Sequence, residues 1–199
     1  LSSTPRASDR PIVGVVGAGT MGAGIAQLAL EAGHEVVLQD VDDAAVARGR
    51  DRIADGLSRR AAKLVDDTAA IDAWVAERMV RLRQTDVVEQ LGDDADVVIE
   101  AALESLDLKQ AIFRALDAVA DERTILATNT SALSIDAIAD ATTRPERVLG
   151  LHFFNPAPVM RLVEVIAGPR TDRDVVARAD ALMRSWGRAT VRVADAPGF

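Results

Sequence analysis

Short apolar runs alternate with longer amphipathic stretches along most of the chain. The short runs are rich in β-branched residues and predict strands at 12–16, 35–39, 96–100, 124–128, 148–153, 162–166 and 190–193. The longer stretches predict helices at 21–32, 42–64, 69–80, 106–119, 134–139 and 174–186. Strands and helices in alternation imply parallel strands joined by right-handed crossovers, so the pattern predicts a doubly wound α/β domain.

The helix predicted at 106–119 has one apolar face. That face consists of Leu108, Ile112, Ala115, Leu116 and Val119. We expect it to pack on the sheet. On this pattern alone, Lys109 is an ordinary surface charge.

The first predicted strand runs into a glycine-rich turn that opens a helix. The turn is Gly17-Ala18-Gly19-Thr20-Met21-Gly22. A turn without side chains lets backbone N–H groups approach a pyrophosphate, and the helix N-terminus adds a partial positive charge. The glycine spacing alone is a weak signal, but a strand before it and a helix after it are what a dinucleotide-binding Rossmann domain requires. A flavodoxin-like fold, in which the glycines serve packing, is the alternative.

An acidic residue follows the glycine turn at the separation expected of a dinucleotide site. Asp40 ends the second predicted strand, about 20 residues after the turn, where a carboxylate can hold the adenosine ribose hydroxyls. Asp42 and Asp43 follow, and no arginine intervenes before Arg48. A 2′-phosphate would meet these like charges, so the sequence predicts NAD rather than NADP as the cofactor.

Composition narrows the classes of function. The chain of 199 residues has a formal net charge of −8, 3% aromatic residues and no cysteine. The lack of a basic, aromatic surface argues against nucleic-acid binding, and the acidic balance argues against binding to an anionic membrane. Without cysteine there are no disulfides and no thiolate metal sites, and we predict no metal centre. Residues 1–10 are polar, lack the apolar stretch of a signal peptide, and are expected to form a disordered arm of a cytoplasmic protein.

The two histidines occupy different ends of predicted strands. His34 follows Gly33 in a helix-to-strand turn, away from the strand ends where ligands bind, and is expected to be a surface residue. His152 lies near the carboxyl end of its strand, at the ligand side of a parallel sheet. Histidine has the pKa of a general base for oxidising an alcohol. For His152 considered alone, a structural role in the core is the simpler interpretation.

A carboxylate strengthens the functional interpretation of His152. If the strands at 148–153 and 162–166 form an antiparallel hairpin centred on Pro158, His152 and Glu164 become direct cross-strand neighbours, with Cβ atoms about 4.5–5.5 Å apart. A carboxylate in that position can hold the imidazole tautomer and stabilise the imidazolium. A surface salt bridge is the alternative.

Five segments together resemble the signature of one family. They are Glu100-Ala101-Ala102-Leu103-Glu104, Thr128-Asn129-Thr130-Ser131, Gly150-Leu151-His152-Phe153-Phe154-Asn155-Pro156, Leu162-Val163-Glu164-Val165-Ile166 and Asp195-Ala196-Pro197-Gly198-Phe199. From Pro11 onward the chain resembles the NAD-binding domain of 3-hydroxyacyl-CoA dehydrogenases, and within the family it is similar to bacterial single-function enzymes of the 3-hydroxybutyryl-CoA or phenylacetate-catabolism type. The resemblance implies reversible, NAD-dependent oxidation of a 3-hydroxyacyl-CoA to the 3-oxoacyl-CoA.

The resemblance also implies catalytic roles. His152 is the base that takes the hydroxyl proton, and Glu164 is the acid that orients it. Ser131 hydrogen-bonds the substrate oxygen at the reacting carbon and also touches the cofactor. For Ser131, a cap of the short helix that begins near Ser134 is the alternative.

Further positions match family contacts to cofactor and substrate. Glu104, Lys109 and Asn155 match positions that contact the nicotinamide half of NAD. For the two charged residues, ordinary surface positions are the alternative. Lys63 matches a position that contacts the CoA moiety, but the chain departs from the family nearby, since Gly56 stands where a hydroxyl residue is expected.

The resemblance extends to parts that these 199 residues do not include. Beyond Phe199 the family continues into an all-helical domain that adds an active-site asparagine, closes the substrate cleft and carries a homodimer interface. We therefore expect the domain at 11–199 to bind NAD and to turn over substrate poorly by itself. Two rival functions are a non-catalytic NAD-binding protein and an oxidoreductase with a catalytic lysine, for which neither Lys63 nor Lys109 is well placed.

Overall fold

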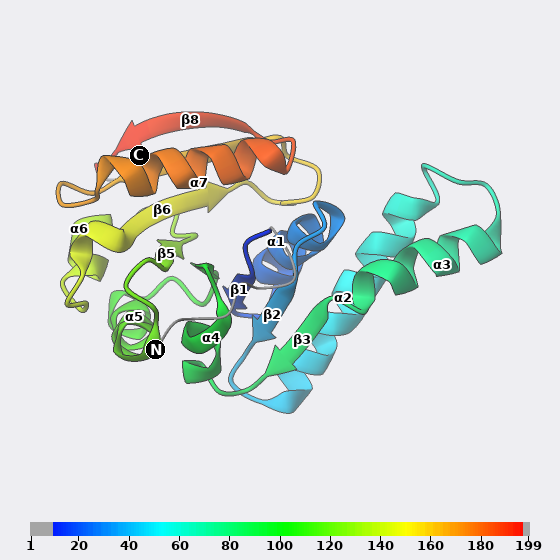
Figure 1. Cartoon of the computed structure of the whole chain (residues 1–199), viewed down its shortest axis with the longest axis horizontal. Helices are drawn as coiled ribbons and strands as arrows, with labels where there is room; N and C mark the ends of the chain where they lie inside the picture. Colours follow the sequence, from blue (N-terminus) through cyan, green and yellow to red (C-terminus); the bar gives the residue numbers. More distant parts are fainter. Residues whose placement is uncertain (1–9, 197–199) are drawn as a thin grey trace.

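The computed structural model describes residues 10–196, with the backbone alone at 92 and 93 (Figure 1). Its strands are β1 (Val13–Val16), β2 (Val36–Gln39), β3 (Leu82–Thr85), β4 (Val97–Glu100), β5 (Ile125–Thr128), β6 (Val148–Phe153), β7 (Leu162–Ala167) and β8 (Ala189–Ala194). Its helices are α1 (Thr20–Glu31), α2 (Asp43–Ala61), α3 (Thr68–Met79), α4 (Glu89–Asp94), α5 (Leu106–Val119), α6 (Ile135–Ala139) and α7 (Arg173–Ser185), with a 3-10 turn at Pro145–Arg147. The arm predicted at 1–10 lies outside the described residues except for its last one.

All eight strands form one sheet in the order β3-β2-β1-β4-β5-β6-β7-β8. Strands β1 to β6 pair in parallel, β7 runs antiparallel to β6, and β8 is parallel to β7. The predicted doubly wound Rossmann domain with an added antiparallel pair is therefore confirmed. The strand order reverses between β1 and β4, and ligands of such sheets bind at the carboxyl ends beside that point.

The sequence pattern did not predict two elements, β3 and α4. Among the described residues, β3 pairs only with β2, and its residues are half-buried or exposed, including Arg83 and Gln84. An edge strand of this kind has no apolar run. The short helix α4 follows it and packs on α5. In the described residues, no helix is long and apolar enough to cross a membrane.

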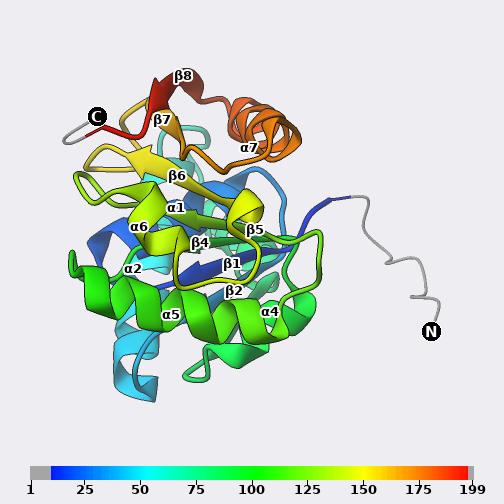
Figure 2. The same ribbon diagram turned by 90° about the vertical axis from the view of Figure 1, so that its left-hand side faces the viewer.

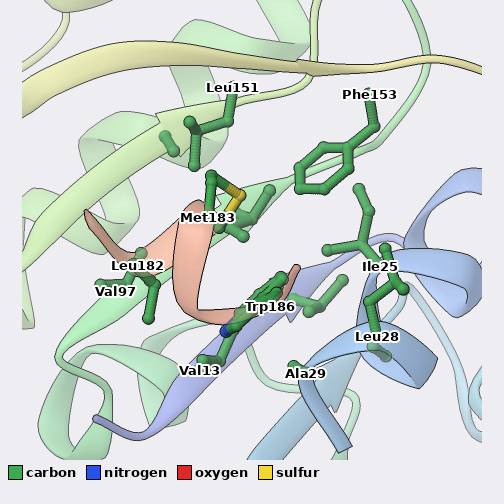
Figure 3. Packing of buried hydrophobic residues seen from close by; sticks show 14 of the residues in the cluster. Val13, Ile25, Leu28, Ala29, Val97, Leu151, Phe153, Leu182, Met183 and Trp186 are labelled. Atoms are coloured by element: carbon green, nitrogen blue, oxygen red, sulfur yellow. The ribbon is translucent and has the colours of Figure 1, made fainter. Parts of the chain in front are cut away.

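The apolar residues of the sheet divide between its two faces. One cluster packs against α1 and α7 and includes Val13, Ile25, Leu151, Phe153, Met183 and Trp186 (Figure 3). The other packs against α5 and α6 and includes Val98, Phe113, Leu126, Ile135 and Ile166. Successive residues of a strand point to opposite faces. His152, between Leu151 and Phe153, therefore lies on the α5 and α6 side, where Figure 2 shows α5 running alongside the strands.

The buried face of α5 differs from the predicted one. Leu108, expected inside, is 37% exposed, whereas Lys109 is fully buried together with Phe113 and Leu116. The apolar residues alone suggested a face that includes Leu108. The buried carboxylate of Glu100 instead draws Lys109 into the interior, so the surface interpretation of this lysine is wrong.

His34 is buried as well, which corrects a second expectation. Its side chain is 4% exposed, because Trp186 of the α7 end packs on it with ring centroids 5.6 Å apart. Nδ1 lies 2.7 Å from the carbonyl oxygen of Pro11. Since a carbonyl oxygen only accepts, Nδ1 carries the proton and donates this bond.

We predict that protonation of His34 lowers the stability of the folded domain in mild acid. Burial lowers the pKa of His34, and although the bond to Pro11 opposes this effect, the Arg10 charge adds to it. The unfolded chain then binds a proton that the folded chain resists. The contribution of His34 to the free energy of unfolding is therefore fully present above about pH 6.5. It falls as the pH drops from there toward the lower pKa of the folded state.

Urea unfolding at several pH values between 7.5 and 5 measures this effect. His34→Gln removes the titrating group and should flatten the decline, whereas Glu35→Gln, at an exposed neighbour, should leave it unchanged. An equal decline in the His34→Gln variant would exclude His34 as its cause.

Candidate active site

The sequence-predicted site residues converge on one edge of the sheet. Strands β1, β2, β4, β5 and β6 are parallel, so their carboxyl ends share that edge. The glycine turn follows β1, Asp40 follows β2, and Glu104 follows β4. Ser131 follows β5, and His152 is near the end of β6. Lys63 lies elsewhere, beyond the end of α2.

The glycine turn has the geometry of an anion cradle. Gly17 has a φ of +92°, and a Cβ there would lie 2.8 Å from the carbonyl oxygen of Ala101. A Cβ at Gly22 would collide with the carbonyl oxygen of Gly17. Gly19 and Thr20 are exposed, and no described side chain caps the first turn of α1. Its N–H groups are therefore available to a pyrophosphate.

Asp40 is bonded to the turn and retains acceptor capacity. One carboxylate oxygen accepts from the N–H of Ala18 at 2.7 Å, and the other accepts from its neighbour Val41 at 2.7 Å. A carboxylate offers about four lone-pair sites, so about two remain for ribose hydroxyls. The turn and Asp40 thus fit a dinucleotide. Arg52, to which the sequence pattern assigned no role, also reaches this turn, and its Nη1 lies 3.3 Å from the carbonyl oxygen of Ala18.

His152 and Glu164 form the predicted pair. They are direct partners in the β6–β7 register, and His152 Nδ1 lies 2.7 Å from Glu164 Oε2. Their side chains are only 17% and 20% exposed, so the pair is not an ordinary surface salt bridge. Because the carboxylate holds a proton on Nδ1, Nε2 is the basic nitrogen of the neutral ring.

Ser131 is exposed at the start of the loop after β5. Its N–H and its hydroxyl lie 2.9 Å and 3.3 Å from Glu104 Oε1. The cap of α6 is Ser134, whose hydroxyl accepts from Ala137 N–H at 3.2 Å, so the helix-cap interpretation of Ser131 is wrong. Asp195 of the closing motif also binds the N–H groups at this helix start.

Two neighbours of Ser131 tie its loop to the site, and sequence analysis gave them no role. Asn129 Oδ1 accepts from the N–H of Phe153 at 2.8 Å, next to His152 on β6. Thr130 is fully buried and donates to Glu104 Oε1 at 2.6 Å. Their positions directly after a strand end were the available signal.

Glu104 and Lys109 belong to one charged group with Glu100. Lys109 Nζ lies 2.7 Å and 2.9 Å from the Glu100 oxygens and 3.5 Å from Glu104 Oε2. Partial burial raises the pKa of Glu104, but hydrogen bonds from Thr130 and Ser131, together with the Lys109 charge, outweigh burial and hold this pKa below its usual value. Glu104 is therefore ionised at neutral pH.

The predicted CoA contact lies apart from this group. Lys63 is exposed in the turn between α2 and α3, a helical pair that projects from the sheet (Figure 1). Gly56 of α2 is buried against α1, where a Cβ would collide with the side-chain amide of Gln27. A hydroxyl residue at this position would therefore require the Gln27 side chain to shift. Asn155 is exposed in the hairpin loop after His152.

Comparisons with known proteins agree with this geometry. The sequence profile of the family described as "3-hydroxyacyl-CoA dehydrogenase, NAD binding domain" matches residues 12–196. The chain is 46% identical over 188 residues to 3-hydroxyadipyl-CoA dehydrogenase of Escherichia coli, with 94% of this chain and 38% of that protein covered. It is 40% identical over 185 residues to 3-hydroxybutyryl-CoA dehydrogenase of Clostridioides difficile, with 93% and 64% covered.

A solved structure gives the same result. The crystal structure of (S)-3-hydroxybutyryl-CoA dehydrogenase from Ralstonia eutropha matches with a TM-score of 0.88 and 41% identity, over 95% of this chain and 65% of that one. The chain thus spans less than two thirds of the length of these relatives. The NAD-binding character predicted from the glycine turn and Asp40 is confirmed at the level of the family.

Asp40 should control the choice of cofactor. We expect this chain to bind NAD at least about tenfold more tightly than NADP, a difference of about 1.4 kcal/mol, and Asp40→Asn to remove most of that preference. Calorimetry with both cofactors measures it, with Asp55→Asn, at an exposed acid of α2, as the control. Equal affinity of the unchanged chain for NAD and NADP would contradict the assignment of Asp40 to the ribose.

Proposed function

Because this chain belongs to the 3-hydroxyacyl-CoA dehydrogenase family through its NAD-binding domain, we propose that it supplies the cofactor site and the proton-transfer pair for interconverting a 3-hydroxyacyl-CoA and a 3-oxoacyl-CoA. The observation that carries the proposal is the 2.7 Å contact of His152 with Glu164, at the sheet edge that also holds the glycine turn. The names of the relatives support an acyl-CoA substrate.

The proposed chemistry needs a base beside a hydride acceptor. NAD, which the glycine turn and Asp40 would hold, would supply the hydride acceptor for the carbon that carries the hydroxyl. His152 Nε2 takes the hydroxyl proton, and Glu164 stabilises the resulting imidazolium through the bond to Nδ1. Ser131, exposed at the same edge, donates its hydroxyl proton to the substrate oxygen and holds it toward the base. In the reverse direction the imidazolium returns its proton to the oxygen.

Two rival functions fit these residues less well. A non-catalytic NAD-binding protein has no need of a largely buried imidazole–carboxylate pair at the ligand edge. A catalytic lysine would have to reach that edge with its amine. Lys109 is enclosed in an ion pair, and Lys63 is on the α2–α3 arm. On that arm, Lys63 is instead suited to bind a phosphate of the CoA moiety.

Loss of the base should abolish most of the turnover. His152→Gln in the full protein is expected to slow reduction of a 3-oxoacyl-CoA by at least about 100-fold, the low end for acid–base catalysis, with NADH affinity nearly unchanged. NADH absorbance measures the rate. His34→Gln changes the other histidine of the chain and should retain activity. A His152→Gln variant with most of its activity would mean that another group is the base.

Loss of the carboxylate should act through the same step. Glu164→Gln keeps the shape of the side chain but removes the charge that faces the imidazolium. A hydrogen bond to a charged group contributes about 1.5–3 kcal/mol, so turnover should fall by roughly 10- to 100-fold. The matched control is Glu122→Gln, at an exposed acid. Equal turnover of Glu164→Gln and the control, at saturating substrate, would remove Glu164 from the mechanism.

A further inference from the structure

A buried polar layer, formed by Glu100 and Thr128, lies at the ends of β4 and β5, on the interior side of the candidate site. Glu100 and Thr128 end β4 and β5, face each other in register, and are both fully buried. Thr128 Oγ1 donates to Glu100 Oε2 at 2.7 Å, and the N–H of Ala102 donates to Oε1 at 2.6 Å. The carboxylate of Glu100 therefore joins two strand ends and the segment that leads to Glu104.

Lys109 supplies the only positive charge in contact with this layer among the described residues. Its side chain has no exposed surface, and it meets Glu100 at 2.7 Å and Glu104 Oε2 at 3.5 Å. A buried ammonium is strongly unfavourable unless carboxylates compensate it. One lysine thus joins a carboxylate inside the protein to a carboxylate that is 41% exposed at the ligand edge.

Glu104, which contacts Lys109, also binds the loop that carries Ser131. Its Oε1 atom accepts from Thr130 Oγ1 at 2.6 Å, from Ser131 N at 2.9 Å and from Ser131 Oγ at 3.3 Å. A carboxylate oxygen has two lone pairs, so the third and longest of these bonds is the weakest. The backbone of Ser131 is firmly held, whereas its hydroxyl can turn away from Glu104 at small cost.

We propose that Lys109 and Glu104 are positioning residues for Ser131. Lys109 fixes Glu104 from behind, and Glu104 fixes the backbone of the Ser131 loop at the edge that carries His152. Without substrate, the single hydroxyl proton of Ser131 is donated to Glu104. With substrate, the hydroxyl rotates and donates the same proton to the substrate oxygen, while the backbone bond remains. This inference rests on the proposed function only for that last step.

A different role would give these two residues direct contact with the cofactor. The burial of the Lys109 ammonium argues against that role for the lysine. For Glu104, three of its hydrogen bonds go to the Ser131 loop. The two roles predict different measurements, because a positioning residue changes the order of the loop and a cofactor contact changes NAD affinity.

Amide hydrogen exchange tests the positioning role on this chain without any turnover. We expect Glu104→Ala to speed exchange of the Ser131 N–H at least tenfold, with an intermediate rate in Glu104→Gln, which keeps an acceptor oxygen. The Ala137 N–H, bonded to Ser134 instead, is the internal control. Asp107→Asn, at an exposed acid in the first turn of α5, is the matched variant and should leave both rates unchanged.

Variants of the buried ion pair between Lys109 and Glu100 distinguish a positioning role from an effect on overall stability. Lys109→Met leaves Glu100 buried without a counter-charge and should lower the melting temperature, or prevent folding. Adding Glu100→Gln removes the uncompensated charge, so the double variant should recover most of the lost stability. Its Ser131 exchange should nevertheless stay at least threefold faster than in the unchanged chain, because Glu104 still lacks its lysine.

The exchange rate of Ser131 decides the outcome. A rate within twofold of the unchanged chain in Glu104→Ala overturns the proposal, and a tenfold loss of NAD affinity in that variant would then assign Glu104 to the cofactor. In the full protein, we expect Glu104→Ala to lower kcat at least tenfold with the KM for NADH within threefold. If the full protein turns over no 3-hydroxyacyl-CoA, the proposed function fails, but the exchange result still tests the positioning role.

Discussion

An ammonium group with no exposed surface fixes the ligand edge of this sheet. Moving a charge out of water costs several kcal/mol. The Lys109 ammonium can be buried between α5 and the sheet because the carboxylate of Glu100 lies 2.7 Å from it. Glu100 is also bound by Thr128 and by the backbone at Ala102, so one ion pair fixes the ends of β4 and β5 and the start of α5. The carbonyl of Ala101, in the same segment, lies against Gly17 of the glycine turn.

Periodicity predicted the pairing of His152 with Glu164 but not the ion pair of Lys109 with Glu100. The side-chain period of a strand is two, so the centre of a hairpin determines every cross-strand pair, and His152 and Glu164 could be paired from the sequence. The orientation of α5 had no such rule. Counting apolar residues placed Leu108 inside, because the pattern of one helix carries no information about a carboxylate at the end of a strand. His34 was misjudged for a similar reason, since Trp186 of a distant helix covers it.

The contacts between the loops after β4 and β5 depend on packing that a sequence motif does not specify. The strand order makes β4 and β5 neighbours, whereas the alternating pattern predicted only that the strands are parallel. Which side chains meet between their loops depends on the loop backbone, so the bonds from Glu104 to Thr130 and Ser131 emerged only in the structure. Gly56 is similar, because its contact with Gln27 of α1 cannot be predicted from the sequence around it.

The candidate cofactor site and the His152–Glu164 pair have separate structural supports. The glycine turn and Asp40 belong to β1 and β2 of the parallel sheet, whereas His152 depends on the antiparallel strand β7 for its carboxylate. Leu151 and Phe153 anchor β6 in the α1 and α7 core, and the residue between them is thereby turned to the opposite face. A Rossmann domain can therefore lose the pair and still bind a dinucleotide. The presence of both at one edge of the sheet, where Asn129 bonds the Ser131 loop to β6, favours a dehydrogenase over a protein that only binds the cofactor.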